Sequence, residues 1–289
     1  MKNVNRRRFL AQAALGMGTA FAIPRLLQAQ GLEELGPDLK QAIGFQTFPI
    51  RDILVKDFPG TLKMMAGLGY QNVEMCSPSG YKDAGYAPLI PMSGKEMKKI
   101  INDQGLTCPS CHFTFDEMKG NLDERIQFAK DLGLSAMICS SFWLGDNGTI
   151  KQYQESSDTL NKIAEKISKA GLITGYHNHE MEFASRDGVL IYDALMAALD
   201  PKLVKMQFQT EVINLGYKAA TYFNKYPGRF ISAHMSDWNK EKKEMPIGQG
   251  IIDWKEFFAA AKSGGVKYFY VEMALDTFKD SATYVHGLV

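Results

Sequence analysis

Two histidines and two carboxylates follow a short apolar stretch in the middle of the chain, in the segment 171–183, Gly-Leu-Ile-Thr-Gly-Tyr-His-Asn-His-Glu-Met-Glu-Phe. The start of this segment has the composition of a strand, and a strand directs alternate side chains to the same face. His177 and His179 are therefore expected to project to one side, where they can converge on one ion. Imidazole and carboxylate groups are the ligands that divalent transition-metal ions bind in proteins.

Other strand-like segments also carry an ionisable side chain at or near their ends: Glu74, His112, Glu211, His234 and Glu272. The carboxyl ends of neighbouring parallel strands meet at one edge of a sheet or barrel, which is where such folds place their active sites. The pattern therefore predicts that these side chains share one polar site.

The N-terminus has the features of an export signal rather than of a folded domain. Arg6-Arg7-Arg8 is followed by the apolar run 11–23, which predicts a twin-arginine signal peptide over residues 1–30 and a periplasmic protein. An N-terminal helix with a basic cap is the alternative. The run is too short to span a membrane, and no later apolar stretch reaches that length.

Removing the leader leaves 259 residues, 31–289, close to the roughly 250 residues of a single (β/α)8 barrel. The leader contains five basic residues and no acidic one, so the remainder has 28 basic and 32 acidic residues and a net charge of −4. This charge gives no reason to expect a nucleic-acid partner.

Strand-like and helix-like segments alternate along the whole of 31–289. Eight strands are expected at 42–48, 72–76, 106–112, 136–141, 172–177, 204–211, 230–234 and 268–272. Helices are expected at 59–67, 94–103, 122–132, 153–170, 191–199, 217–224, 254–262 and from 280. The first strand runs into Gly44-Phe45-Gln46-Thr47-Phe48-Pro49, which lacks a glycine-rich phosphate fingerprint, so a doubly wound dinucleotide-binding sheet is less favoured than a closed α/β barrel. We expect a single-domain (β/α)8 TIM barrel.

Four cysteines raise the question of redox chemistry, because Cys108-Pro-Ser-Cys111 has the spacing of a dithiol motif. No strand, turn and helix of the thioredoxin type surround the pair. Cysteines within apolar strands behave as small buried hydrophobic residues, and this interpretation is preferred to a disulfide or a catalytic dithiol.

Several motifs lie along residues 43–272: Tyr176-His177-Asn178-His179 with Glu182-Phe183, Lys225-Tyr226-Pro227-Gly228-Arg229, His234-Met235-Ser236-Asp237, Pro246-Ile247-Gly248-Gln249-Gly250 with Asp253-Trp254, and Val271-Glu272. In combination they resemble the sugar phosphate isomerase/epimerase family, the xylose isomerase-like TIM barrels that also include ketose 3-epimerases, inosose dehydratases and endonuclease IV.

The resemblance implies a divalent metal ion, Mn2+, Mg2+, Co2+ or Zn2+, bound by residues of the fifth to eighth strands. The family's acid, histidine and acid on the last three strands correspond to Glu211, His234 and Glu272. The acid of the fifth strand has no counterpart, so His177 or His179 replaces it, and His177 is favoured. The structural alternatives are a satisfied core histidine at 234 and a simple ion pair at 211.

The loss of one carboxylate puts a two-base epimerisation in question. One carboxylate base and one histidine acid also suit isomerisation, or elimination and hydration beside a keto group. Glu272 is the expected proton-abstracting base and His179 the complementary acid. The remaining expected residues are a further catalytic carboxylate and three substrate contacts: Glu74, and then His112, Gln209 and Asn178.

The substrate is expected to be an unphosphorylated sugar or keto-sugar, because Ser236 stands where many relatives have a lysine that can bind phosphate. The leading hypothesis is a metal-dependent isomerase or epimerase. The alternatives are a lyase or hydratase acting on 3-keto-sugars or glycosides, and a non-catalytic sugar-binding barrel. A nuclease is disfavoured because the chain has only five histidines and the part without the leader is acidic. Whether the chain forms a homo-oligomer is left open by the sequence.

Overall fold

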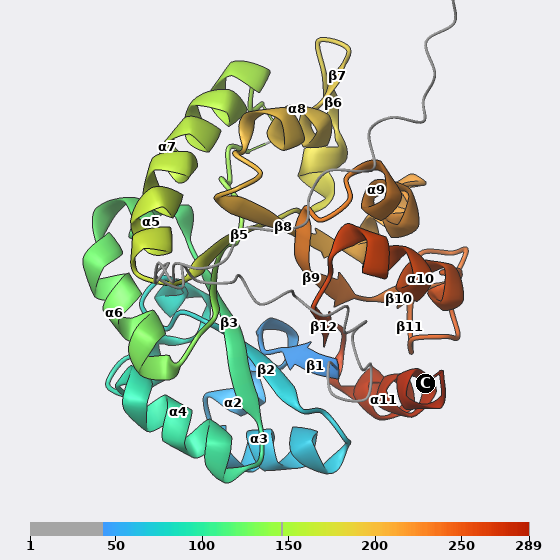
Figure 1. Ribbon diagram of the computed structural model, residues 1–289. Helices are drawn as coiled ribbons and strands as arrows, with labels where there is room; N and C mark the ends of the chain where they lie inside the picture. Colours follow the sequence, from blue (N-terminus) through green and yellow to red (C-terminus); the bar gives the residue numbers. More distant parts are fainter. Residues whose placement is uncertain (1–42, 146, 289) are drawn as a thin grey trace, which may run out of the picture. The chain divides into compact units, whose positions relative to one another are not determined.

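A closed barrel of eight parallel strands forms the centre of the protein (Figure 1). The computed structural model describes residues 43–145 and 147–288, so the expected signal peptide lies outside the described residues. The barrel belongs to the compact unit Gly36–Val289. Its strands, in order around the barrel, are β1 Ile43–Gln46, β2 Asn72–Cys76, β3 Thr107–Phe113, β4 Ala136–Cys139, β5 Ile173–His177, β8 Val204–Gln209, β9 Phe230–Met235 and β12 Tyr268–Val271. The expected single-domain (β/α)8 barrel is confirmed.

Helices lie around the outside of the strands (Figure 1). They are α2 Arg51–Leu54, α3 Phe58–Gly67, α4 Gly94–Asp103, α5 Phe115–Gly120, α6 Leu122–Leu132, α7 Ile150–Lys169, α8 Ile191–Ala198, α9 Ala219–Lys225, α10 Trp254–Gly264 and α11 Phe278–Gly287. Helices α4, α5 and α7 each begin at a capping box, in which Ser93, Thr114 or Thr149 pairs with an acid or amide three residues later. Within the described residues, no helix is long and apolar enough to cross a membrane.

The strands are buried on both faces, as expected for parallel strands covered by helices. The barrel interior is nevertheless polar over part of its height, because its register aligns polar residues of neighbouring strands. Glu74 pairs with Gln46 on one side and Ser110 on the other, and His177 pairs with Gln207. This register places buried polar groups directly beneath the strand ends.

Strand β8 ends two residues earlier than expected. The chain turns after Gln209 into the 3-10 helix η5, Thr210–Leu215, where the Gln209 side chain accepts a hydrogen bond from the Glu211 N–H at 3.5 Å. The polar side chain at the end of this strand is therefore that of Gln209. Glu211 lies beyond the strand, in the turn.

The loop after β9 is folded around the buried carboxylate of Asp237. Its two oxygens accept hydrogen bonds from the N–H groups of Gly248, Gly250 and Ile252 and from the indole of Trp254 at 2.8 to 3.2 Å. Gly250 is required here, because a Cβ at this position would lie 2.1 Å from Asp237 Oδ1. One carboxylate thus fixes the path of the chain from β9 to α10.

The four cysteines are free thiols and all are buried. Cys108 and Cys111 lie on the same strand, β3, and burial raises the pKa of the Cys108 thiol to about 12. A buried thiol of high pKa is a poor nucleophile, which agrees with the interpretation of these residues as small apolar fillers.

Candidate active site

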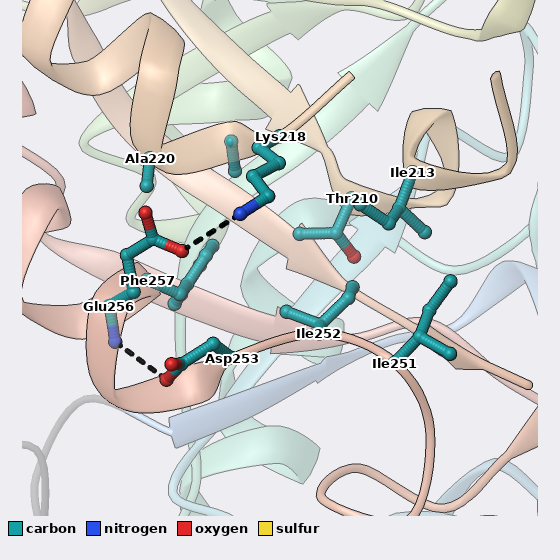
Figure 2. A pocket seen from close by; sticks show the side chains of 10 residues that line it. Thr210, Ile213, Lys218, Ala220, Ile251, Ile252, Asp253, Glu256 and Phe257 are labelled. Atoms are coloured by element: carbon teal, nitrogen blue, oxygen red, sulfur yellow. Dashed lines mark hydrogen bonds and ion pairs between the residues drawn. The ribbon is translucent and has the colours of Figure 1, made fainter. Parts of the chain in front are cut away.

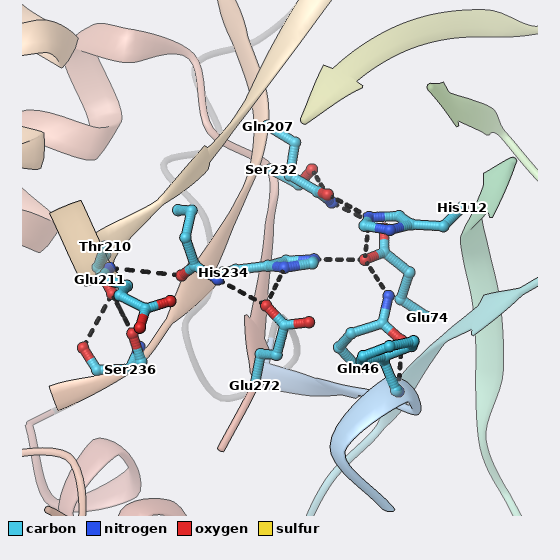
Figure 3. A network of polar contacts seen from close by, with 12 residues as sticks. Gln46, Glu74, His112, Gln207, Thr210, Glu211, Ser232, His234, Ser236 and Glu272 are labelled. Carbon is cyan, nitrogen blue, oxygen red and sulfur yellow. Dashed lines mark hydrogen bonds and ion pairs between the residues drawn. The ribbon is translucent and has the colours of Figure 1, made fainter. Parts of the chain in front are cut away.

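Polar side chains from most of the barrel strands meet at their carboxyl ends (Figure 3). His112 lies near the end of β3, His177 ends β5, Gln209 ends β8, His234 lies near the end of β9, and Glu272 directly follows β12. Each lies at or directly after the carboxyl-terminal part of its strand, so the fold presents them together at the edge where (β/α)8 barrels bind substrates.

Three of these histidines form a compact cluster. One ring nitrogen from each of His112, His177 and His234 lies within 4.8 Å of the others, and all three residues are buried. The rings of His112 and His234 are stacked, with centroids 5.1 Å apart, and the ring of His177 lies 4.4 Å from that of His234. The cluster combines two expected metal-site residues with His112, which was expected to contact substrate.

His234 bridges two carboxylates (Figure 3). Its Nδ1 lies 2.7 Å from Glu272 Oε2, and its Nε2 lies 2.5 Å from Glu74 Oε2. Burial lowers the pKa of His234, but the negative charges of Glu272 and Glu74 outweigh that effect and raise it to about 10. Without another cation, both ring nitrogens therefore carry protons and donate.

Glu74 lies beneath the histidines and is fully buried. Its Oε1 accepts hydrogen bonds from Ser110 Oγ at 2.6 Å and from Gln207 Nε2 at 2.7 Å. Its Oε2 accepts from Gln46 Nε2 at 2.9 Å, in addition to its contact with His234. Burial raises the pKa of Glu74, but His112 and His234 hold it well below its usual range. Both oxygens are engaged, so this carboxylate is an ionised support for the histidines.

The position of the proton on the His112 ring is fixed by Gln207. Its Nε2 lies 2.6 Å from Gln207 Oε1, while the amide nitrogen of Gln207 donates to Glu74 and, at 2.8 Å, to Ser232 Oγ. An amide oxygen only accepts, so His112 Nε2 is the donor. Gln207 and Ser232 were not expected as site residues from the sequence, although Gln207 is two residues before Gln209 on the same strand and must project to the same face.

His177 and His179 differ from His112 and His234 because each has a ring nitrogen without a hydrogen-bond partner in the described chain. The Nδ1 atoms of both are buried without a hydrogen-bond partner among residues 43–145 and 147–288. Burial lowers the pKa of His177 well below its ordinary value, and it lowers that of His179 to about 4. Both rings are neutral at pH 7. A buried polar atom without a partner is costly, so these nitrogens suit an ion or a substrate group.

Glu272 is the carboxylate of the site that remains partly accessible, with 17% of its side chain exposed against 0% for Glu74. Gln209 Nε2 donates to its Oε2 at 2.6 Å, and His234 contacts the same oxygen. Burial raises the pKa of Glu272, but His234 outweighs this effect and lowers it. Within the described chain, Oε1 has no protein partner.

Two other expected site residues are not part of the histidine cluster. Asn178 is buried, and its Oδ1 accepts from the N–H of Gln209 at 3.3 Å, so it supports the end of β8. Glu211 instead lines an open groove beside His179. Burial and the nearby charges of Glu180 and Glu272 raise the pKa of Glu211 to about 7.

A second hollow lies at the start of α10, between that helix, η5 and α9 (Figure 2). Its apolar wall includes Ile251, Ile252 and Phe257, and Lys218 pairs with Glu256 across it at 3.5 Å. Its volume of about 70 Å³ holds a few water molecules, whereas small-molecule sites usually measure roughly 300–1,000 Å³. This hollow is too small for a sugar.

A model of the family described as xylose isomerase-like TIM barrel matches residues 62–288 of the chain. No protein among the curated sequences matches it. Its fold is similar to that of a sugar phosphate isomerase/epimerase from Parabacteroides distasonis ATCC 8503, with a TM-score of 0.70 and 24% identity over 84% of this chain and 93% of that one.

Two other similar structures carry different activities in their names. The probable 3-DHS dehydratase AsbF from Bacillus anthracis has a TM-score of 0.66 and 11% identity, over 85% of this chain and 98% of its own. A D-psicose 3-epimerase has a TM-score of 0.61 and 11% identity, over 86% and 97%. At these identities the likeness shows a shared fold.

Proposed function

Because the chain belongs to the xylose isomerase-like TIM barrel family, we propose that it is a metal-dependent enzyme that removes a proton next to the carbonyl group of an unphosphorylated sugar or keto-sugar. The observation that carries this proposal is the histidine cluster with an accessible, ionised carboxylate at its edge. Isomerisation or epimerisation is the leading reaction.

The residues present fit a divalent cation. His177 offers a buried Nδ1 without a partner, His234 turns Nδ1 toward Glu272, and Gln209 adds an amide at the same carboxylate. Nitrogen and carboxylate donors suit Zn2+, Mn2+ or Co2+. Glu74 would then accept the remaining proton of His234, the usual arrangement of a carboxylate behind a metal-bound histidine. A bound cation would polarise the carbonyl and hydroxyl oxygens of the sugar.

The protein's own groups account for the proton transfer. Glu272 is ionised, and its Oε1 is available to accept a proton from the substrate carbon. His179 is neutral at pH 7, so it donates a hydrogen bond to a substrate oxygen rather than bringing a full charge. The Glu74, Gln207 and Ser110 network keeps the histidines in place and takes no part in the transfer.

A lyase or hydratase reaction is the second candidate, and one observation favours it. Epimerisation by two bases needs a second carboxylate that can reach the substrate. Glu74 is fully buried with both oxygens engaged, and Glu211 lies beyond the strand end. A single carboxylate base with a neutral histidine is sufficient for a β-elimination, in which the base removes the proton next to a carbonyl and the histidine protonates the group that leaves the following carbon.

We would test both reactions with metal analysis and isotope exchange. The protein over residues 31–289 is expected to contain one equivalent of Mn, Zn or Co, which His177→Ala loses and His179→Ala keeps. Incubation with aldoses, ketoses and 3-keto-glucosides in D2O should place deuterium next to the carbonyl. Release of an aglycone would identify the lyase, and a new sugar isomer would identify the isomerase or epimerase. Failure to retain metal or exchange deuterium after reconstitution would leave a sugar-binding barrel.

We further infer that the working form is residues 31–289 in the periplasm. The Arg6-Arg7-Arg8 motif and the apolar run that follows it support this location. Fusing residues 1–30 to a reporter should send the reporter to the periplasm, and changing Arg6 and Arg7 to lysine should keep it in the cytoplasm. Export of the lysine variant through another route would contradict the twin-arginine assignment.

A further inference from the structure

An open groove extends from the candidate active site along η4, Glu180–Phe183, and η5. It has a volume of about 780 Å³, within the range of small-molecule sites, and its lining includes His179, Glu180, Met181, Glu211, Leu215 and Tyr217. Glu272, His112, His177 and His234 do not line this groove, so a sugar ring bound at those residues would leave it free. The site therefore has room for a second group attached to that ring.

Trp143 contacts His179, which lines the groove, and its conformation is unusual. Its side chain is 54% exposed, its backbone is in the left-handed region with φ of 51°, and its ring centroid lies 4.6 Å from that of His179. A left-handed conformation is unfavourable for a bulky residue and is usually kept where it has a function. A large aromatic surface exposed next to a catalytic cluster is available for a ligand.

A buried carboxylate holds this arrangement in place. Glu182 is fully buried, and its Oε1 accepts hydrogen bonds from Ser141 Oγ at 2.8 Å and Tyr176 Oη at 2.9 Å. Its Oε2 accepts from the N–H of His179 at 2.8 Å. Ser141 Oγ in turn accepts from the N–H of Trp143 at 3.3 Å. The backbones of Trp143 and His179 are therefore both held by Glu182, the first through Ser141 and the second directly.

The charge of the groove limits what can bind. Glu180 and Glu211 line it, and no lysine or arginine is among the described residues that do. Carboxylates accept hydrogen bonds from sugar hydroxyl groups but repel a phosphate. An exposed aromatic face beside carboxylates is suited to an uncharged ring with many hydroxyl groups.

We propose that this groove is a subsite for the second ring of an uncharged disaccharide or glycoside, which stacks on Trp143 while its hydroxyl groups donate to Glu180 and Glu211. The inference rests on the proposed function, because it places the reacting ring at Glu272 and His177. It makes a glycoside rather than a free monosaccharide the preferred substrate.

Calorimetric titration of the Mn2+-reconstituted protein tests the subsite. The probes are maltose, cellobiose and lactose, each compared with glucose or galactose, together with glucose 6-phosphate. At least one disaccharide should bind about tenfold more tightly than its component monosaccharides, whereas glucose 6-phosphate should bind no more tightly than glucose. Trp143→Ala should abolish the preference and leave the monosaccharide Kd within about twofold. Trp143→Phe should retain most of it.

Ile251→Ala is the matched control, because Ile251 is also exposed but lines the hollow near α10. It should change none of these constants. Equal affinity for all disaccharides and monosaccharides, or a preference that survives Trp143→Ala, would overturn the subsite. The readout is binding and not turnover. An active enzyme without the preference therefore contradicts the subsite alone, and an inert protein with it contradicts the proposed reaction alone.

Discussion

Glu74 and Glu272 contact opposite nitrogens of the same histidine, yet their surroundings differ. Glu74 is fully buried and both its oxygens accept hydrogen bonds from neighbouring strands. Glu272 is partly exposed, and both of its protein donors contact Oε2 alone. The comparison teaches that a carboxylate whose hydrogen-bonding capacity is used up can only position its neighbours, whereas one with a free oxygen can react.

The largest expected effect comes from replacing the Glu272 carboxylate, whose Oε1 is free to react, by an amide. Glu272→Gln should lower kcat by about 10³-fold or more, because the amide cannot take a proton from carbon. The circular dichroism spectrum should remain that of the wild type, since the amide oxygen can still accept from Gln209. A variant with near-normal turnover would remove Glu272 from the mechanism and with it the contrast to Glu74.

Glu74→Gln should change the positions of the histidines and lower the stability of the fold. An amide cannot accept hydrogen bonds at both termini, so His234 and its neighbours lose a charged partner in a buried site. We expect a loss of about 2–3 kcal/mol in the free energy of unfolding and a roughly 10–100-fold weaker affinity for metal. Denaturant unfolding and metal titration measure the two effects. If kcat fell with metal saturated and stability unchanged, Glu74 would be a reacting group after all.

Gln209 and Glu211 provide a smaller contrast at the end of β8. Gln209→Leu removes the donor to Glu272, so kcat should fall by about tenfold. Glu211→Gln should leave both kcat and metal content within about threefold of wild type, because Glu211 lies in the turn. Metal analysis separates the two residues. Loss of metal from Glu211→Gln would restore it to the metal site and would require the turn to rearrange.

The smallest expected effect concerns Glu117, a buried carboxylate outside the site. Burial raises its pKa to about 7 from 4.5, against hydrogen bonds from Thr114 and Ser77 that lower it. A raised pKa means that the folded state prefers the protonated acid, so its contribution to stability is lost as the pH rises from about 4.5 through 7.

Between pH 5 and pH 8 this loss should be on the order of 2 kcal/mol, or several degrees in Tm. Glu117→Gln should remove this part of the pH dependence, and the exposed Glu124→Gln serves as its control. Identical Tm profiles for wild type and Glu117→Gln would show that Glu117 does not titrate in this range.

The fold could be predicted because its signals are local. Helices expected at 94–103 and 122–132 agree with α4 and α6, since their apolar periodicity and end signals are contained in the segments themselves. Helix α5, Phe115–Gly120, was missed because it is only a short turn after a strand. Its capping box, Thr114 with Glu117, was the available signal.

The site was harder to predict because it depends on register between strands that are distant in the sequence. His177, His234 and Glu272 were identified individually from their places at strand ends. The network around Glu74 of β2 arises only when the closed barrel brings Gln207 of β8 and His234 of β9 to it. Glu211 was expected on the strand because 207–211 alternates well, but the chain turns at Gln209 to enter η5. Where a strand ends is set by the packing of the following turn.

The support of Trp143 by Glu182 has a consequence for how the proposed enzyme can diversify. Glu74 supports the histidine cluster through hydrogen bonds, and Glu182 supports the proposed subsite in the same way. Among the described residues, no hydrogen bond joins the two networks. Changes at Trp143 that keep Ser141 and Glu182 can therefore alter which second ring is accepted, whereas loss of Glu182 would also release His179 from its position.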